Sequence, residues 1–158
     1  MSLLQSKLYD GDNLIAVNVA DFVRELVSMV LKAFEQEQVE VNYQIGQGEI
    51  LPADSMMRVG LIMNELVTNA CKYAFPDNPN PALQVVAFLT HKTFHLCVRD
   101  NGPGFASSDM LYRSFGLRLI QMQVEQLFGT HQFERNRGFQ FDMTFPLFPS
   151  FPFSKDAK

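Results

Sequence analysis

Asp100 is a carboxylate at the end of an apolar strand pattern, and the turn Asn101-Gly102-Pro103-Gly104 follows it. A carboxylate accepts hydrogen bonds, and adenine presents an amino donor where guanine presents an acceptor, so this residue could distinguish the two bases. Glycines leave the neighbouring backbone open to a flat ligand. The segment therefore indicates purine recognition, although by itself it also fits a tight turn.

A second set of polar groups, Glu65, Asn69 and Lys72, falls within a predicted helix. Residues three and four apart lie on the same helix face, so these side chains form a polar stripe beside the apolar stripe of residues 59–73. The polar stripe indicates a surface that faces a ligand. For an isolated helix it also fits a solvated face with a hydrogen bond between Glu65 and Asn69.

Gly116 lies near the expected start of another helix, in the segment Ser114-Phe115-Gly116-Leu117. The first amides of a helix have no partner within the helix and attract anions. The segment therefore indicates an anion site, while a glycine at this position also fits close packing of the helix.

Hydrophobic periodicity and turn residues place these motifs in an order of helix, strand, helix, two strands, helix, two strands. This order predicts an α+β fold in which the helices pack on one face of a mostly antiparallel sheet. The 158 residues fit a single domain. The expected ranges are 18–38, 52–75 and 114–128 for the helices, and 39–45, 82–90, 93–99, 131–134 and 138–145 for the strands.

Composition excludes several classes of protein. The net charge of −4 argues against a nucleic-acid-binding surface, which needs clustered Lys and Arg. No apolar run reaches the roughly 20 residues that span a bilayer, and the N-terminus lacks a signal-peptide pattern, so we expect a cytoplasmic protein without direct membrane contact. The two cysteines and three histidines lack the spacing of a disulfide framework or a metal cluster.

Taken together, the motifs resemble the ATP-binding catalytic domain of histidine kinases, whose superfamily includes gyrase, mismatch-repair and heat-shock-chaperone ATPases. The likeness runs over about residues 51–145, and residues 64–76 and 114–119 are similar to one sensor histidine kinase subfamily with a short ATP lid. It implies a Bergerat-type ATP-binding fold, a two-layer sandwich with three helices on one face of a mixed, mostly antiparallel sheet of about five strands. The matching patterns are Glu65-x-x-x-Asn69-x-x-Lys72-Tyr73, Asp100-x-Gly102-x-Gly104 and Gly116-Leu117-x-Leu119.

The resemblance implies roles for four residues of the second helix. Asn69 would bind Mg²⁺ through its amide oxygen, because this ion prefers hard oxygen donors. Glu65 stands where the superfamily places a general base, and in a kinase it would orient a magnesium-bound water or the incoming imidazole. Lys72 would approach the phosphates of ATP, and Tyr73 would contact the adenine or the ribose.

The resemblance also assigns the two glycine segments to ATP. Asp100 would bind the adenine amino group, and Gly102 and Gly104 would admit the base. Residues 105–113 would form a lid over the phosphates. Within this lid, Phe105 would line the adenine pocket and Arg113 would reach the γ-phosphate. The backbone amides expected to bind the phosphates belong to Ser114, Phe115, Gly116 and Leu117.

Three departures from the family pattern bear on activity. Ser114 stands where many relatives have a glycine, although the short-lid subfamily tolerates serine there, and Phe139 stands where relatives often have threonine. All three histidines fall within or after the nucleotide-binding motifs, so no phosphoacceptor histidine is visible. We therefore expect a catalytic fragment whose partners are an upstream phosphoacceptor and dimerisation domain and, indirectly, a response regulator receiver domain. The expected divisions are 1–17, a remnant of the phosphoacceptor region, 18–147, the ATP-binding domain, and 148–158, a Phe/Pro-rich tail.

Two other functions fit the same motifs. A free-standing serine kinase of the anti-sigma type shares this fold and approximate length, but the lead-in and the Phe75-Pro76 pair favour a sensor histidine kinase. The departures at Ser114 and Phe139 would also suit a degenerate nucleotide-binding or protein-interaction module without catalysis.

Overall fold

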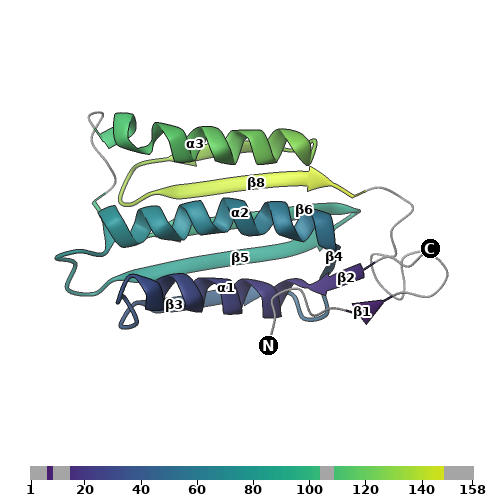
Figure 1. The fold of residues 1–158 in the computed structure, drawn as a ribbon, viewed down its shortest axis with the longest axis horizontal. Coiled ribbons are helices and arrows are strands. Elements are labelled where there is room, and N and C mark those ends of the chain that lie inside the picture. Colours follow the sequence, from purple (N-terminus) through teal and green to yellow (C-terminus); the bar gives the residue numbers. More distant parts are fainter. Residues whose placement is uncertain (1–6, 9–14, 104–108, 148–158) are drawn as a thin grey trace.

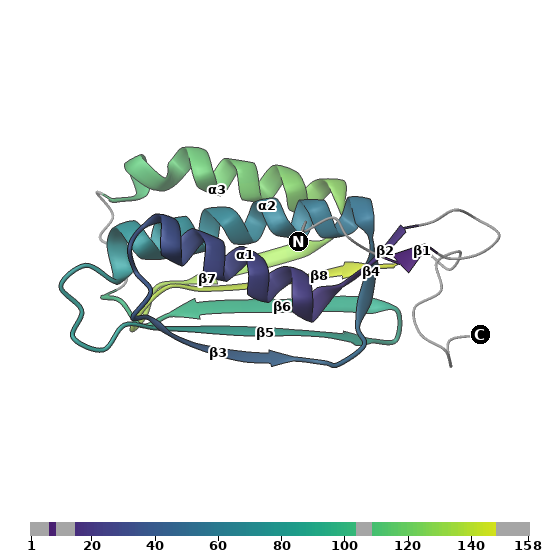
Figure 2. The ribbon, with the colours of Figure 1, turned by 60° about the horizontal axis from the view of Figure 1, so that its bottom comes forward.

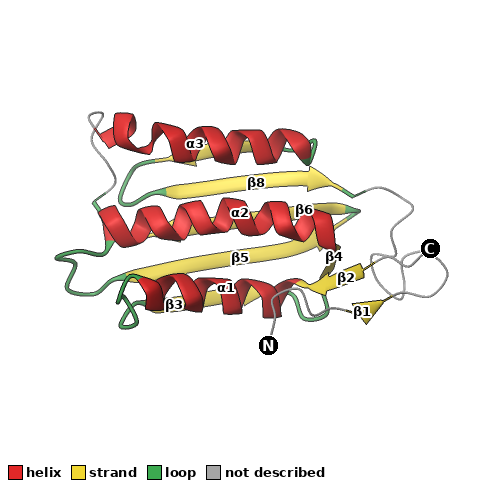
Figure 3. Ribbon diagram, in the orientation of Figure 1, coloured by secondary structure: helices red, strands yellow, loops and turns green. Residues whose placement is uncertain are grey.

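The protein forms two layers, with helices packed on one face of a five-stranded sheet (Figures 1 and 3). The computed structural model describes residues 7–8, 15–103 and 109–147. Figure 2 shows the three α-helices on the same side of the sheet, and no helix of the described residues covers its other face, called here the open face. The α-helices are α1 (Val19–Ala33), α2 (Ala53–Asn69) and α3 (Asp109–Gln126).

The main sheet has the order β3-β5-β6-β8-β7. The first two strands in this order are parallel to each other, and every other neighbouring pair is antiparallel. The predicted α+β class, with three helices on one face of a mixed and mostly antiparallel sheet, is confirmed. The strands are β3 (Glu40–Ile45), β5 (Ala82–Thr90), β6 (Thr93–Asp100), β7 (Thr130–Glu134) and β8 (Gln140–Pro146).

The hairpin of β5 and β6 places Asp100 at one end of the sheet. His91 and Lys92 form its two-residue turn with φ angles of 49° and 64°, the left-handed values that a tight hairpin needs. The residue pairs of this hairpin extend from the turn to Leu83, which pairs with Asp100, the last residue of β6. Asp100 therefore emerges at the end of the sheet remote from the hairpin turn.

The core lies between the helices and the sheet. Asn18 accepts a hydrogen bond from the amide of Asp21 at 2.9 Å and so caps α1. Gly60 of α2 admits the ring of Phe22 from α1, since a Cβ atom at Gly60 would lie 2.9 Å from two carbons of that ring. The largest fully buried aromatic side chains are Phe75, Phe94, Phe141 and Phe145.

A second, smaller sheet joins three strands that the sequence pattern did not predict. It has the order β1-β2-β4 and is made of β1 (Lys7–Leu8), β2 (Ile15–Asn18) and β4 (Ile50–Pro52). Ala16 and Val17 are each only 2% exposed and belong to the main hydrophobic cluster. Ala16 and Val17, which the sequence placed in the lead-in, thus pack into the same core as the helices.

The helices differ from their expected ranges. α1 ends at Ala33 rather than near residue 38, and Glu35 then adopts a φ angle of 55°. α2 passes directly into a π-helix, η1 (Ala70–Ala74), which closes with a hydrogen bond from the Phe75 amide to the Ala70 carbonyl. α3 begins at Asp109, five residues before the expected start at Ser114. Within the described part of the chain, no helix combines the length and apolar character needed to cross a membrane.

The environment of His131 predicts a pH dependence of stability. This β7 residue lies 5.2 Å from the Phe133 ring and 6.0 Å from the Phe141 ring, measured between centroids. Burial lowers the pKa of His131, and nearby Glu125 offsets only part of the shift. A histidine with a lowered pKa in the folded state resists protonation, so its contribution to stability is present above about pH 6.5 and is lost as the pH falls through its folded pKa.

We therefore expect His131→Gln to flatten the decrease in unfolding free energy between about pH 6.5 and pH 5. Urea unfolding at several pH values measures this effect. His91→Asn serves as a control, because His91 is exposed in the hairpin turn and asparagine tolerates its left-handed backbone. An unchanged pH profile in the His131 variant would contradict the assignment.

Candidate functional site

Asp100 is a buried carboxylate that accepts two backbone hydrogen bonds through one oxygen. Its side chain is 6% exposed, and Oδ1 accepts from the Gly102 amide at 3.0 Å and from the Phe139 amide at 3.1 Å. These bonds hold the turn after β6 against the segment that enters β8. The carboxylate is therefore fixed in orientation at the end of the sheet, as a residue that reads a ligand by hydrogen bonding must be.

Gly138 and Phe139 support Asp100, and sequence reasoning missed this role. Gly138 has a φ angle of 107°, and a Cβ atom there would collide with the Asp100 carbonyl oxygen. Only glycine permits this approach, which delivers the Phe139 amide to the carboxylate. Phenylalanine at 139 packs on Phe133, with ring centroids 5.3 Å apart. A glycine directly before a residue that departs from the family pattern is the sequence signal that could have found this contact.

Gly102 packs against the end of the helix that carries the polar stripe. A Cβ atom at Gly102 would lie 2.5 Å from the Cβ and 2.6 Å from the Cα of Ala74, the last residue of η1. The glycine is therefore explained by contact with Ala74, and its predicted role in admitting adenine remains a prediction. Through this contact the Asp100 turn is seated on the α2–η1 helix.

Asn101 ties the same turn to the loop after η1, and sequence reasoning did not single it out. Its Oδ1 accepts from the Ala82 amide at 2.9 Å and from Asn78 Nδ2 at 3.1 Å. Its Nδ2 donates to the Asn80 carbonyl at 2.7 Å, and Asn78 also donates to the Ala74 carbonyl at 3.2 Å. This network joins the Asp100 turn, the 75–81 loop and the end of η1.

Glu65 and Asn69 lie against Gly116 of α3. A Cβ atom at Gly116 would lie 2.7 Å from Glu65 Oε2 and 3.8 Å from Asn69 Nδ2. The expected polar stripe is thus brought together with the second glycine segment, although the two are about 50 residues apart in the sequence. The absence of a side chain at Gly116 makes room for the Glu65 carboxylate.

Asn69 carries a polar atom that lacks a partner. Its Nδ2 is buried and forms no hydrogen bond within the described residues, a state that costs about 1–3 kcal/mol. A phosphate oxygen or water could accept from it, and a half-turn of the amide would instead present the oxygen to a cation. No three His, Cys, Asp or Glu side chains of the described residues could form a closed metal site. An amide and a carboxylate suit Mg²⁺, which keeps waters and phosphates as its other ligands.

The expected free amides at the start of α3 are not found. Because α3 begins at Asp109, residues 114–117 lie inside the helix, where amides donate to carbonyls four residues earlier. The prediction that Ser114, Phe115, Gly116 and Leu117 begin this helix is therefore wrong. The physical reason is that residues 109–113 contain neither glycine nor proline and so continue the helix upstream.

The remaining predicted residues differ in their surroundings. Lys72 is exposed on η1, and Tyr73 is half-buried beside it. Phe115 is 81% exposed, whereas Leu117 is 8% exposed and joins the core. Gly104 and Phe105 lie outside the described residues. Arg113 and Ser114 belong to α3 by their backbone, and their side chains lie outside the described part of the chain.

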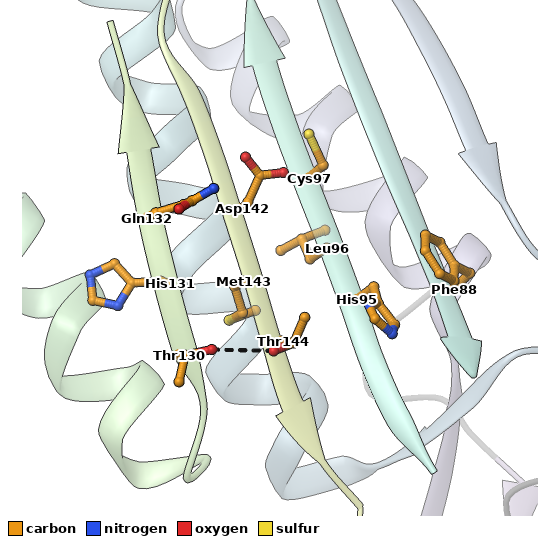
Figure 4. A pocket seen from close by; sticks show the side chains of 10 residues that line it. All are labelled: Phe88, His95, Leu96, Cys97, Thr130, His131, Gln132, Asp142, Met143 and Thr144. Atoms are coloured by element: carbon orange, nitrogen blue, oxygen red, sulfur yellow. Dashed lines mark hydrogen bonds between the residues drawn. The ribbon is translucent and has the colours of Figure 1, made fainter. Parts of the chain in front are cut away.

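A separate hollow lies on the open face of the sheet. It has a volume of about 420 Å³ and contains none of the predicted site residues. Figure 4 shows Phe88, His95, Cys97 and Thr144 among its lining residues, with the helices behind the strands. Burial and the neighbouring Asp142 carboxylate raise the pKa of the Cys97 thiol to about 12, so this cysteine is not an activated nucleophile. The predicted motifs therefore remain the candidate site.

The α2–η1 helix is the element on which the predicted motifs meet. Gly116 contacts it at Glu65 and Asn69, and Gly102 contacts it at Ala74. Five residues separate Asn69 from Ala74, about 7.5 Å along a helix. A buried acceptor at the Asp100 turn and a group of polar atoms at Glu65 and Asn69 therefore lie along one helix, a spacing that suits a ligand with a base at one end and an anionic group at the other.

Residues 19–144 match the protein family described as the histidine kinase-like ATPase domain. A search among curated proteins found no match. Similar solved structures include the histidine kinase domain of the Erythrobacter litoralis EL346 blue-light activated histidine kinase, with a TM-score of 0.72 and 21% identity over 90% of this chain and 65% of that one. The longer structure of that kinase gives a TM-score of 0.73 and 21% identity over 83% of this chain, which spans only 42% of it.

Two further histidine kinases have the same fold. The mycobacterial sensor histidine kinase MprB gives a TM-score of 0.65 and 14% identity, over 83% of this chain and 97% of that one. The catalytic domain of histidine kinase ThkA gives a TM-score of 0.67 and 15% identity, over 84% of this chain and 95% of that one. At these identities the comparison establishes a common fold.

The Asn101 network can be tested by removing its side chain. Asn101→Ala should lower the free energy of unfolding by about 1 kcal/mol, because the network is partly open to solvent. Amide hydrogen exchange should become faster at Ala82, which loses its side-chain acceptor. Asn42→Ala on the open sheet face is the matched control. Equal exchange rates at Ala82 in the parent and the Asn101 variant would show that the network does not hold the turn.

Proposed function

Because the chain belongs to the histidine kinase-like ATPase domain family, we propose that it is the ATP-binding catalytic domain of a sensor histidine kinase. In this proposal it positions Mg-ATP for transfer of the γ-phosphoryl group to a histidine on a phosphoacceptor and dimerisation domain of the same protein. A response regulator receiver domain would then receive the phosphoryl group from that histidine.

The observation that carries this proposal is the meeting of three separate motifs on the α2–η1 helix. Phosphoryl transfer requires mainly that the protein position the reactants and neutralise charge. The contacts of Gly102 with Ala74 and of Gly116 with Glu65 bring the Asp100 turn and the polar group of Glu65 and Asn69 onto one rigid element. This support is geometric and independent of the family match.

At the adenine end, Asp100 would accept the hydrogen bond of the exocyclic amino group. Its Oδ1 already holds the Gly102 and Phe139 amides, so the carboxylate is preorganised before any ligand binds. Preorganisation lowers the cost of binding, because no side-chain freedom is lost at that step. Half-buried Tyr73 would contact the base or the ribose from η1.

At the phosphate end, Asn69 and Glu65 would hold Mg²⁺, with Glu65 acting through a bound water and also orienting the incoming imidazole. Magnesium would supply positive charge that neutralises the phosphates there. Exposed Lys72 would supply a further positive charge. Contact between phosphates and the amides of residues 114–117 would require the first turns of α3 to unwind, and the side chain of Arg113 would then approach the γ-phosphate.

Asp100→Asn tests the adenine end. The asparagine oxygen can still accept from Gly102 and Phe139, but its amide nitrogen is a donor and opposes the adenine amino group. We expect the Kd for ATP, measured by calorimetry, to rise by about 10- to 100-fold while the fold is retained. Asp142→Asn, on the open sheet face, should leave the affinity unchanged. An unchanged affinity in Asp100→Asn would reject the role.

Asn69→Ala tests the phosphate end. We expect the variant to bind ATP with nearly the same affinity in the presence and absence of Mg²⁺, because the amide ligand is missing. Titrations of parent and variant under both conditions measure this difference. Asn64→Ala, an exposed position on the same helix, is the matched control and should keep the full magnesium dependence. Full magnesium dependence in the Asn69 variant would show that another residue binds the ion.

A further inference from the structure

Arg58 and Gln123 form a polar contact between α2 and α3 that the proposed function does not use. Arg58 Nη1 donates to Gln123 Oε1 at 2.9 Å, across 65 residues of sequence. Gln123 is one of the few buried polar side chains of the described residues, with 9% of its surface exposed. A buried side-chain amide between two helices must be hydrogen-bonded to avoid a large desolvation cost, so this contact is strongly constrained.

The Arg58–Gln123 contact lies in the same α2–α3 interface as Glu65 and Asn69, the predicted phosphate end of the site. Arg58 precedes Glu65 by seven residues on α2, and Gln123 follows Gly116 by seven residues on α3. Seven residues are about two helical turns, or roughly 10.5 Å, and return to nearly the same face. The two helices run in opposite directions beside each other (Figure 1). The Arg58–Gln123 pair and the Glu65–Gly116 pair are therefore two contacts of one interface between α2 and α3.

Burial of apolar surface is non-directional, so the apolar contacts restrict the register of the two helices only through the shapes of the packed side chains. A hydrogen bond with a fixed length and angle defines that register. The register of the two helices also determines the contact of Gly116 with Glu65, since a Cβ atom at Gly116 would already lie 2.7 Å from Glu65 Oε2. A small slide of α3 along α2 would bring the side chain of a neighbouring residue against Glu65 and Asn69.

We propose that Arg58 and Gln123 are positioning residues of the nucleotide site, whose hydrogen bond sets α3 along α2 so that Gly116 stays opposite Glu65 and Asn69. This inference rests on the proposed function of that site. It predicts that loss of the contact weakens binding of the magnesium-bound triphosphate and leaves recognition of adenosine unchanged, because the two amides that donate to Asp100 Oδ1 belong to Gly102 and Phe139, which lie outside α3.

The test uses Arg58→Met, Gln123→Leu and the double variant in the full 158-residue chain. The double variant replaces both polar partners by apolar groups, so that no buried atom is left unpaired and the fold should be kept. We expect its Kd for Mg-ATP, measured by calorimetry, to rise about tenfold, with an unchanged Kd for adenosine. Gln123→Leu alone should show the same selective effect, which excludes a simple loss of positive charge.

Two controls complete the experiment. Arg58→Lys keeps a donor toward Gln123 and should restore most of the Mg-ATP affinity, while Arg99→Met removes an exposed cation from the open sheet face and should change neither Kd. Parent-like Mg-ATP binding in the double variant would overturn the inference, as would an equal loss of Mg-ATP and adenosine binding. A parent chain that binds neither ligand would overturn the proposed function and this inference together.

Discussion

The burial of the Asp100 carboxylate is the constraint on which the site depends. A buried carboxylate must receive hydrogen bonds, and two backbone amides supply them to a single oxygen. One of these amides comes from the turn after β6 and the other from the residue before β8. The need to satisfy one charge therefore joins two segments about 40 residues apart and determines where the turn lies.

The α2–η1 helix plays the corresponding role for the rest of the site. Its apolar face packs on the sheet and on Phe22 of α1, while its polar face receives Gly116 and its end receives Gly102. The change from α- to π-hydrogen bonding occurs at Ala70, immediately after Asn69. Single π-helical turns at α-helices are frequent at functional sites. Here the change lies between the Asn69 amide and the Lys72 and Tyr73 side chains.

Much of the fold was predictable because local patterns and tertiary packing agree. The alternation of apolar and polar residues located β5 and β6 to within one residue, and the two-residue turn at His91 and Lys92 fixed their register. The small sheet was not predictable in this way. β1, β2 and β4 have two, four and three residues, which are too few to show a detectable alternation of apolar and polar side chains. These strands exist because segments that are distant in the sequence pair with each other.

The sequence by itself determined which side chains are able to do the chemistry: an acceptor at the end of a strand, a polar stripe on one helix face and a glycine that a neighbouring side chain can approach. The tertiary structure alone decided what each glycine contacts, which amides hold Asp100, and that α3 starts at Asp109 rather than at Ser114. The physical reason is the distance along the sequence over which each interaction acts. Helix faces and strand alternation follow from the geometry of neighbouring residues, whereas a buried polar atom finds its partner only after the whole chain has packed.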